Sequence, residues 1–211
     1  ISGVVDHLAE NDAHALAIAR RIVKDLNWKK QPPVTLTVPT EPAGIALSPD
    51  GTKLIVTCAA PKSTIVVLDA GSGETLATIP AGHTAGATAL SPDGTRLYVC
   101  NRFDHNVSVI DLPAARQIVR VAAVREPVAV TVTPDGRTVL VANHLPNTRT
   151  DSEYTGDAAA AVSIFDAQTY ATDVIGLPDG ANGLRGICTS PDGTRVLVTH
   201  LLSNFRMVPF R

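Results

Sequence analysis

The chain has 211 residues, of which 45% are hydrophobic and 18% charged, and its formal net charge at pH 7 is −2. This composition is typical of a compact globular protein, and the small net charge argues against a nucleic-acid or membrane partner. The longest apolar run is far shorter than the ~20 residues that span a bilayer, and no signal peptide is visible. We therefore expect a soluble protein, whose compartment the sequence does not indicate.

The first predicted element is an N-terminal helix, with Asn11 or Asp12 as its N-cap. Apolar residues recur after the cap at helical spacing. They are Leu16, Ala19, Val23 and Leu26. Two prolines, Pro32 and Pro33, then end the segment as a linker. We expect residues 1–33 to form a separate helix and linker.

This N-terminal segment, Ile1–Asn27, resembles a fragment of the carboxyltransferase subunit of methylcrotonyl-CoA-type acyl-CoA carboxylases. The resemblance covers a small part of that large enzyme. One helix cannot form its acyl-CoA or biotin pockets, so the resemblance implies no catalytic role here. The chain looks like a fusion of two unrelated gene fragments.

Four copies of a Ser/Thr-Pro-Asp-Gly tetrapeptide organise the remainder of the chain, at 48–51, 91–94, 133–136 and 190–193. Proline presets φ for a turn and glycine supplies a positive φ, so each copy is predicted to close a hairpin between its flanking apolar runs. The glycines are 43, 42 and 57 residues apart. A period near forty residues with short strands is typical of β-propeller blades.

Two more strands follow each of the first three hairpins. The predicted third strands are Thr64–Asp69, Asn106–Asp111 and Ala161–Asp166, and the fourth strands are Thr75–Ile79, Gln117–Val121 and Thr172–Ile175. Most strands are apolar on both faces, as expected of sheets stacked between neighbouring sheets. The extra residues of the long third interval fall at about 147–160, in a polar segment predicted to be a surface loop.

The repeats identify a family. Residues 34–211 resemble YVTN-type β-propeller repeats, in the units Pro42–Asp69, Thr84–Asp111, Pro127–Asp166 and Leu184 onward. The resemblance implies a fold and not an activity. The predicted fold is all-β, with four four-stranded propeller blades per chain in residues 34–211, a half-propeller preceded by the helix of residues 1–33.

The strand count also predicts an assembly. Val34–Val38 has the position of an outermost strand, and Arg195–Thr199 and Phe205–Phe210 are the last two predicted strands. A stack of four blades would leave two apolar sheet faces bare. We expect a homodimer whose two arcs form an eight-bladed ring about a twofold axis. Strand 34–38 of one chain could then complete the last blade of the other.

Counting from each turn glycine places polar side chains at one mouth of the central channel. They are Glu41, His83, Asn101, Glu126, Asn143, His144, Arg185 and His200. Imidazole and carboxylate together are ligands of zinc or a similar divalent ion. We expect His83, His144 and His200 as metal ligands, Glu41 or Glu126 as a general base, and Arg185 beside the developing anion.

The predicted function is a metal-dependent hydrolase of activated small-molecule esters, lactones or phosphotriesters. The alternative is a non-catalytic propeller binding module, and a third possibility is an accidental fusion without an evolved role. Simpler interpretations exist for single residues: Asn101 and Asn143 could bond local backbone, while Glu41 and Glu126 precede proline and could be solvated. His105 is interpreted as polar loop surface. The three cysteines show no CxxC spacing, which argues against a disulfide framework.

Overall fold

The computed structural model describes residues 38–39, 41–145, 159–178 and 181–202. All of them belong to one unit of the chain, Val38–Arg211. The predicted helix of residues 1–33 and the predicted strand Phe205–Phe210 lie outside the described residues, as do all but the last residue of strand Val34–Val38 and nearly all of the predicted loop 147–160.

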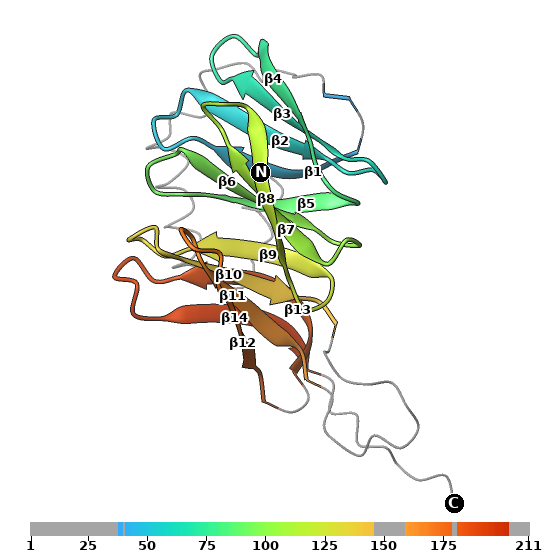
Figure 1. Cartoon of the computed structure of the whole chain (residues 1–211), viewed down its shortest axis with the longest axis vertical. Coiled ribbons are helices and arrows are strands. Elements are labelled where there is room, and N and C mark those ends of the chain that lie inside the picture. The colour runs from blue at the N-terminus through green and yellow to red at the C-terminus, as the bar shows by residue number, and fades with distance from the viewer. Residues whose placement is uncertain (1–37, 40, 146–158, 179–180, 203–211) are drawn as a thin grey trace, which may run out of the picture. The chain divides into compact units, whose positions relative to one another are not determined.

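Within these ranges the chain forms strands and no helix, and the strands make four antiparallel sheets (Figure 1). The first sheet contains β1 (Pro42–Leu47), β2 (Lys53–Cys58), β3 (Thr64–Asp69) and β4 (Thr75–Pro80). The second contains β5 (Ala85–Leu90), β6 (Arg96–Asn101), β7 (Asn106–Asp111) and β8 (Arg116–Ala122). The third contains β9 (Pro127–Val132), β10 (Thr138–Asn143), β11 (Ala161–Asp166) and β12 (Thr172–Gly176), and the fourth contains β13 (Ala181–Thr189) and β14 (Val196–Leu202).

Each tetrapeptide forms the turn that joins the first two strands of its sheet. The four turn glycines have φ between 70° and 73°, the left-handed region that favours glycine. In the first turn, Asp50 Oδ1 accepts hydrogen bonds from Ser48 Oγ and from the Thr52 amide, and Ser48 Oγ accepts one from the Lys53 amide. The other three turns repeat these bonds. The turn chemistry predicted from the sequence is confirmed.

Three apolar layers fill the spaces between neighbouring sheets. Ile55 and Ile65 of the first sheet pack with Leu97 and Val99 of the second. The next layer joins the second and third sheets, with Tyr98, Cys100, Val107 and Val109 on one side and Val139, Val141 and Phe165 on the other. The last joins the third and fourth, through Leu140, Ala142, Val162 and Leu184 with Ile187 and Val198 packed against them. The second and third sheets are therefore covered by neighbouring sheets on both faces.

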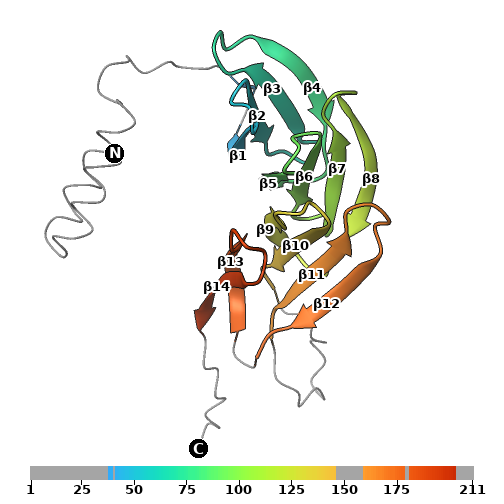
Figure 2. The ribbon, with the colours of Figure 1, turned by 90° about the vertical axis from the view of Figure 1, so that its left-hand side faces the viewer.

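The sheets stack so that equivalent strands lie side by side. Figure 2 shows β1, β5, β9 and β13 on one side of the stack and β4, β8 and β12 on the opposite side. The turns also stack: a Cβ atom on Gly94 would lie 3.0 Å from Cδ of Pro49, and one on Gly136 would lie 3.4 Å from Cδ of Pro92. The glycines of the second, third and fourth turns thus give room to the proline of the preceding turn.

The all-β prediction is confirmed, and the stacked four-stranded sheets are consistent with a propeller-like fold. Of the three strands predicted for the last blade within this chain, two are described, β13 and β14, and the third, Phe205–Phe210, lies outside the described residues. The first strand of this sheet begins at Ala181, three residues before the start at Leu184 that the repeat pattern predicted. Its pairing with β14 shifts register between Asn182 and Gly186. No helix in the described ranges is long and apolar enough to cross a membrane.

The turn carboxylates predict an acid-dependent contribution to stability. Hydrogen bonds from Ser48 Oγ and Thr52 lower the pKa of Asp50 to about 2 from its ordinary value of 3.8. Because the folded pKa lies below the unfolded one, the contribution is complete above about pH 5 and fades as the pH falls toward about 2. We expect Asp50→Asn to lower the urea midpoint at pH 7, and its difference from wild type to shrink as the pH falls from about 5 to about 2.

The matched control is Glu74→Gln, a substitution at an exposed carboxylate in the turn between β3 and β4. It should leave the urea midpoint nearly unchanged across the same range. An Asp50→Asn difference that is constant with pH would contradict the account.

Candidate functional site

In each sheet, the start of the first strand is paired with the end of the antiparallel second strand. The loop that enters the first strand and the loop that leaves the second strand therefore meet along one edge of the stack. Cα pairing brings Pro42 beside Cys58, and Pro127 beside Asn143. Ala85 is likewise paired with Asn101. We call this edge the rim. It comprises residues 41, 58, 82–85, 101–105, 124–127, 143–145, 182–185 and 200–201. It contains every site residue predicted from the sequence.

Four equivalent rim residues have positive φ: 38° at Glu41, 54° at Thr84, 50° at Glu126 and 63° at Gly183. In the first three sheets, the carbonyl of this residue accepts the amide of the residue that follows the second strand, at 2.8 to 3.2 Å. Strand pairing shifts register at the same place in each sheet. The positive φ therefore belongs to a repeated β-bulge at the entry to the first strand.

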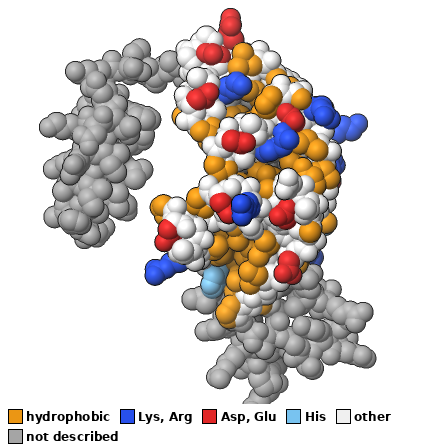
Figure 3. Space-filling model, turned by 60° about the vertical axis from the view of Figure 1, so that its left-hand side comes forward, with side chains coloured by type: hydrophobic (Ala, Val, Ile, Leu, Met, Phe, Trp, Pro, Cys, Tyr) orange, Lys and Arg blue, Asp and Glu red, His pale blue; other side chains and the backbone are white. Residues whose placement is uncertain are grey.

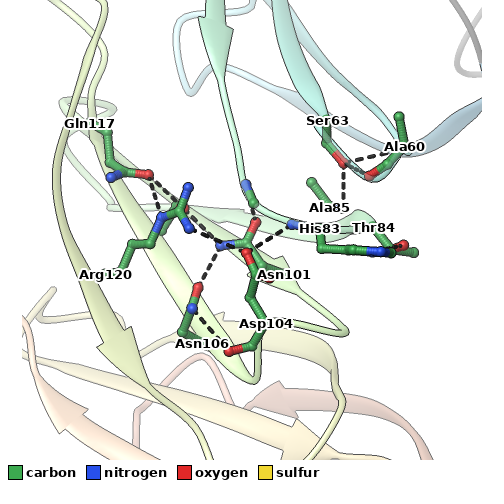
Figure 4. A network of polar contacts seen from close by, with 12 residues as sticks. Ala60, Ser63, His83, Thr84, Ala85, Asn101, Asp104, Asn106, Gln117 and Arg120 are labelled. Atoms are coloured by element: carbon green, nitrogen blue, oxygen red, sulfur yellow. Dashed lines mark hydrogen bonds and ion pairs between the residues drawn. The ribbon is translucent and has the colours of Figure 1, made fainter.

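Asn101 is the centre of a buried polar network in the second sheet (Figure 4). Its Oδ1 accepts the Gly82 amide at 2.9 Å, and its Nδ2 donates to Asn106 Oδ1 at 2.7 Å and to Ser108 Oγ at 2.8 Å. Ser108 Oγ in turn lies 3.0 Å from Gln117 Oε1. All of these partners lie within or at the entry of the same sheet, so the network holds the rim loops of that sheet in place.

Asn143 has the same place in the third sheet and is also fully buried. Its Nδ2 donates to the Ala161 carbonyl at 2.8 Å and to Ser163 Oγ at 3.0 Å. Its Oδ1 has no hydrogen-bond partner among the described residues. The amide of Val124, which occupies the place of the Gly82 amide, donates to Ser163 Oγ instead. Both asparagines are thus engaged by local groups.

Glu126 is held by a neighbouring sheet. Its Oε2 accepts from Nε of Arg102 at 2.9 Å and from Nη2 at 2.8 Å, which joins the end of β6 to the entry of β9. The Arg102 guanidinium also lies 5.3 Å from the ring centroid of Phe103. The Glu126 amide donates to Nδ1 of His105 at 3.0 Å. This carboxylate, predicted as a general base, is therefore part of an inter-sheet ion pair.

His144 links the third sheet to the fourth. Its Nδ1 lies 3.2 Å from the Leu184 carbonyl, and its own carbonyl accepts the Gly183 amide at 3.1 Å. Because a carbonyl oxygen only accepts, Nδ1 carries the hydrogen in this contact and Nε2 is left as the nitrogen that could bind a metal. A histidine oriented in this way by a backbone carbonyl is common among metal ligands.

The other predicted site residues lie further along the rim. Nδ1 of His83 is 2.8 Å from Thr84 Oγ1, and its ring meets Phe103 edge-on at a centroid distance of 5.3 Å. Glu41, Arg185 and His200 are exposed, on the rims of the first and fourth sheets. Within the described ranges, no three His, Cys, Asp or Glu side chains come together where they could hold a metal ion.

Sequence reasoning missed two residues that organise this edge. Arg102 pairs with Glu126, and His105, interpreted as polar loop surface, accepts the Glu126 amide. Both side chains lie in the loop that follows β6. A count of repeat positions could place this loop at the rim, but it could not show which side chain reaches the next sheet.

A cavity of about 670 Å³ lies at the other end of the strands, between the turns of the second and third sheets. Its lining includes Tyr98, Arg96, Asp135, Arg137 and Tyr170. Arg96 is already paired with Asp111 at 2.8 Å, and Tyr98 is 1% exposed. Burial raises the pKa of Tyr98 to about 12, so its hydroxyl is neutral at pH 7. None of the site residues predicted from the sequence lines this cavity.

Two partial matches to known proteins cover different shares of the chain. No family model matches the chain. Methylcrotonoyl-CoA carboxylase beta chain, mitochondrial, of Dictyostelium discoideum is 58% identical over 41 residues, which are 19% of this chain and 7% of that protein. Among solved structures, a chain of Kuenenia stuttgartiensis hydrazine synthase is similar with a TM-score of 0.52 and 22% identity, over 81% of this chain and 58% of that chain.

These matches limit what can be transferred. The chain spans a small fraction of the carboxylase subunit, and less than two thirds of the hydrazine synthase chain. At 22% identity the second likeness concerns the fold alone. The short carboxylase match is of the kind that the first residues of the chain led us to expect. Neither comparison assigns an activity to the rim.

The ion pair between Arg102 and Glu126 should be measurable. Its side chains are 38% and 16% exposed, so solvent screens the pair in part. A double-mutant cycle with Arg102→Ala and Glu126→Ala should give a coupling free energy of about 0.5–1 kcal/mol that decreases in 1 M salt. Chemical denaturation of the four proteins measures it.

The control cycle uses Arg120 and Asp104, whose contact is longer at 3.2 Å and whose side chains are 41% and 31% exposed. Its coupling should be smaller. Equal couplings in the two cycles, or none for Arg102 and Glu126, would show that the pair does not join the sheets.

Proposed function

We propose that the rim belongs to a non-catalytic binding module with propeller-like architecture. The observation that carries this proposal is that the polar side chains at the centre of the rim are used within the protein. Glu126 is paired with Arg102, and Asn101 and Asn143 are buried in local networks. Such a rim is a set of rigidly held loops, the usual arrangement for binding on a scaffold.

The residue types support the same reading. A general base needs a carboxylate that can reach a substrate proton, and a catalytic metal ion usually needs three protein ligands. Glu126 already accepts two hydrogen bonds from one guanidinium. The described residues of one chain supply no group of three metal ligands. Exposed side chains that remain on the rim, with Glu41, Arg185 and His200 among them, suit polar recognition of a partner.

The second candidate is the metal-dependent hydrolase, and the observation in its favour is His144. Its Nδ1 is oriented by the Leu184 carbonyl, which leaves Nε2 for a divalent ion such as zinc. Further ligands, His200 and His83 among them, would have to come from a second chain, because one chain does not complete a site in its described residues. The ion would supply Lewis-acid activation for the cleavage of an activated ester, lactone or phosphotriester.

One experiment separates the two candidates. The protein is purified without a metal-affinity tag, incubated with zinc, exchanged into metal-free buffer, and assayed for bound zinc and for hydrolysis of an activated phosphotriester. If the protein is a binding module, we expect it to retain less than one tenth of an equivalent of zinc per chain and to hydrolyse the phosphotriester no faster than the buffer blank. It also predicts that His144→Ala and His200→Ala match wild type in both assays.

The outcome that would overturn the binding module is about half an equivalent of zinc or more per chain, with hydrolysis that both histidine variants lose. Histidine protonation would then release the metal, so activity would decline below about pH 6. His14→Ala is the matched control, because His14 precedes the repeats in the sequence and was not expected to bind metal.

A further inference from the structure

The contact between neighbouring sheets recurs three times with the same parts. A side chain four residues after the turn glycine points toward the following sheet: Ile55, Tyr98 and Leu140 are 0%, 1% and 5% exposed at this position. A side chain six residues before the glycine points toward the preceding sheet. Val130 has this place in the third sheet and is 8% exposed. Each internal sheet therefore has one forward face and one backward face.

At the ends of the stack, the same positions are open. Leu197 follows Gly193 by four residues, as Ile55 follows Gly51, but it is 64% exposed. Ile45 precedes Gly51 by six residues, as Val130 precedes Gly136, but it is 68% exposed. Leu47, four residues before Gly51, is 55% exposed, whereas Leu90 and Val132 have this position in the second and third sheets and pack into the inter-sheet layers. The last sheet thus has an uncovered forward face, and the first has an uncovered backward face.

Figure 3 shows hydrophobic side chains exposed in the lower part of the unit, toward the end of the stack that contains the last sheets. The turns end in the same way. The glycines of the second, third and fourth turns each have the proline of the preceding turn within 3.4 Å of a Cβ position, whereas Gly51 has nothing within 4 Å. The first turn has room for a proline that no preceding turn supplies.

We propose that a second copy of this chain covers both open faces, with the forward face of the last sheet of one copy on the backward face of the first sheet of the other. Leu197 of one copy then packs on Ile45 and Leu47 of the other. Pro191 of one copy then lies beside Gly51 of the other, in the same way that Pro49 lies beside Gly94 within one chain. Two such contacts related by a twofold axis close a ring.

A polar contact fixes the same register. Thr57 Oγ1 donates to the Gly86 carbonyl of the next sheet at 2.8 Å. Thr57 is six residues after its turn glycine, and Gly86 is eight residues before its own. Thr199 and Ala43 have these two positions at the ends of the stack. The Thr199 hydroxyl therefore donates to the Ala43 carbonyl of the second copy.

A second copy is the occupant because this chain itself carries both halves of the repeated interface, one at each end. The apolar residues and the turn proline and glycine follow the spacing of the three internal contacts, and the threonine follows that of the contact between the first and second sheets. An unrelated partner would have to reproduce that spacing on both faces. This pairing uses the end faces and is independent of what the rim binds.

The test is complementation between two variants of the full chain. Leu197→Asp damages the forward face and Ile45→Asp the backward face, since each places a charge in an apolar contact. By light scattering after gel filtration, wild type should have twice the 22.1 kDa mass of one chain, and each variant alone should be monomeric. An equimolar mixture of the two variants should recover dimers, because each mixed dimer retains one undamaged contact.

Ile118→Asp is the matched control, because Ile118 is a 36% exposed residue on the outer strand β8, away from both end faces. It should remain dimeric. Thermal unfolding followed by circular dichroism shows whether each variant is folded, and recovery in the mixture is itself incompatible with misfolding. A monomeric wild type, open polymers, or dimers that survive both substitutions would overturn the proposal.

Discussion

The burial of apolar side chains between stacked sheets is the interaction on which this structure depends. The central strands of the second and third sheets are apolar on both faces, so neither sheet could be stable alone in water. Val99 points into the layer shared with the first sheet, and Tyr98 and Cys100 point into the layer shared with the third. Each sheet therefore stabilises its two neighbours, as expected of a repeat architecture.

This constraint also sets the position of the rim. Because the apolar layers fix each sheet against the next, loops from different sheets are held close enough for directed contacts. Arg102 reaches Glu126 across one such boundary, and His144 reaches the Leu184 carbonyl across the next. These contacts use most of the polar groups at the centre of the rim. The same packing that positions the rim loops thus determines which of their polar side chains are paired across a sheet boundary.

Local chemistry explains why so much of the fold could be predicted. Proline and glycine at fixed turn positions, with alternating apolar residues on either side, determine the hairpins without reference to distant residues. The strand Thr64–Asp69 was therefore predicted at its observed bounds. The first strand of the last sheet was less predictable, because its pairing continues beyond the bulge, with Ala181 beside Leu202 and Asn182 beside Leu201. A bulge leaves little trace in a pattern of apolar residues.

The sequence predicted where the candidate site residues lie, but it did not predict which side chains they contact. Repeat spacing placed Glu41, Glu126, His144 and His200 along one edge, because equivalent residues of stacked sheets must lie at the same end of the strands. Whether a side chain there is free depends on neighbours distant in sequence. Arg102 is 24 residues from Glu126, and the Leu184 carbonyl is 40 residues from His144. No short motif encodes such pairs.

The central claim, that sheets bury apolar side chains against one another, is tested most directly at Cys100. Its thiol is 1% exposed in the layer between the second and third sheets, and burial raises its pKa. The measurement is the rate of Cys100 alkylation against denaturant concentration, resolved by mass spectrometry from that of Cys188, which is exposed in the single chain. The account predicts that Cys100 reacts only as the protein unfolds. Alkylation of Cys100 in native buffer at the rate of a free thiol would contradict it.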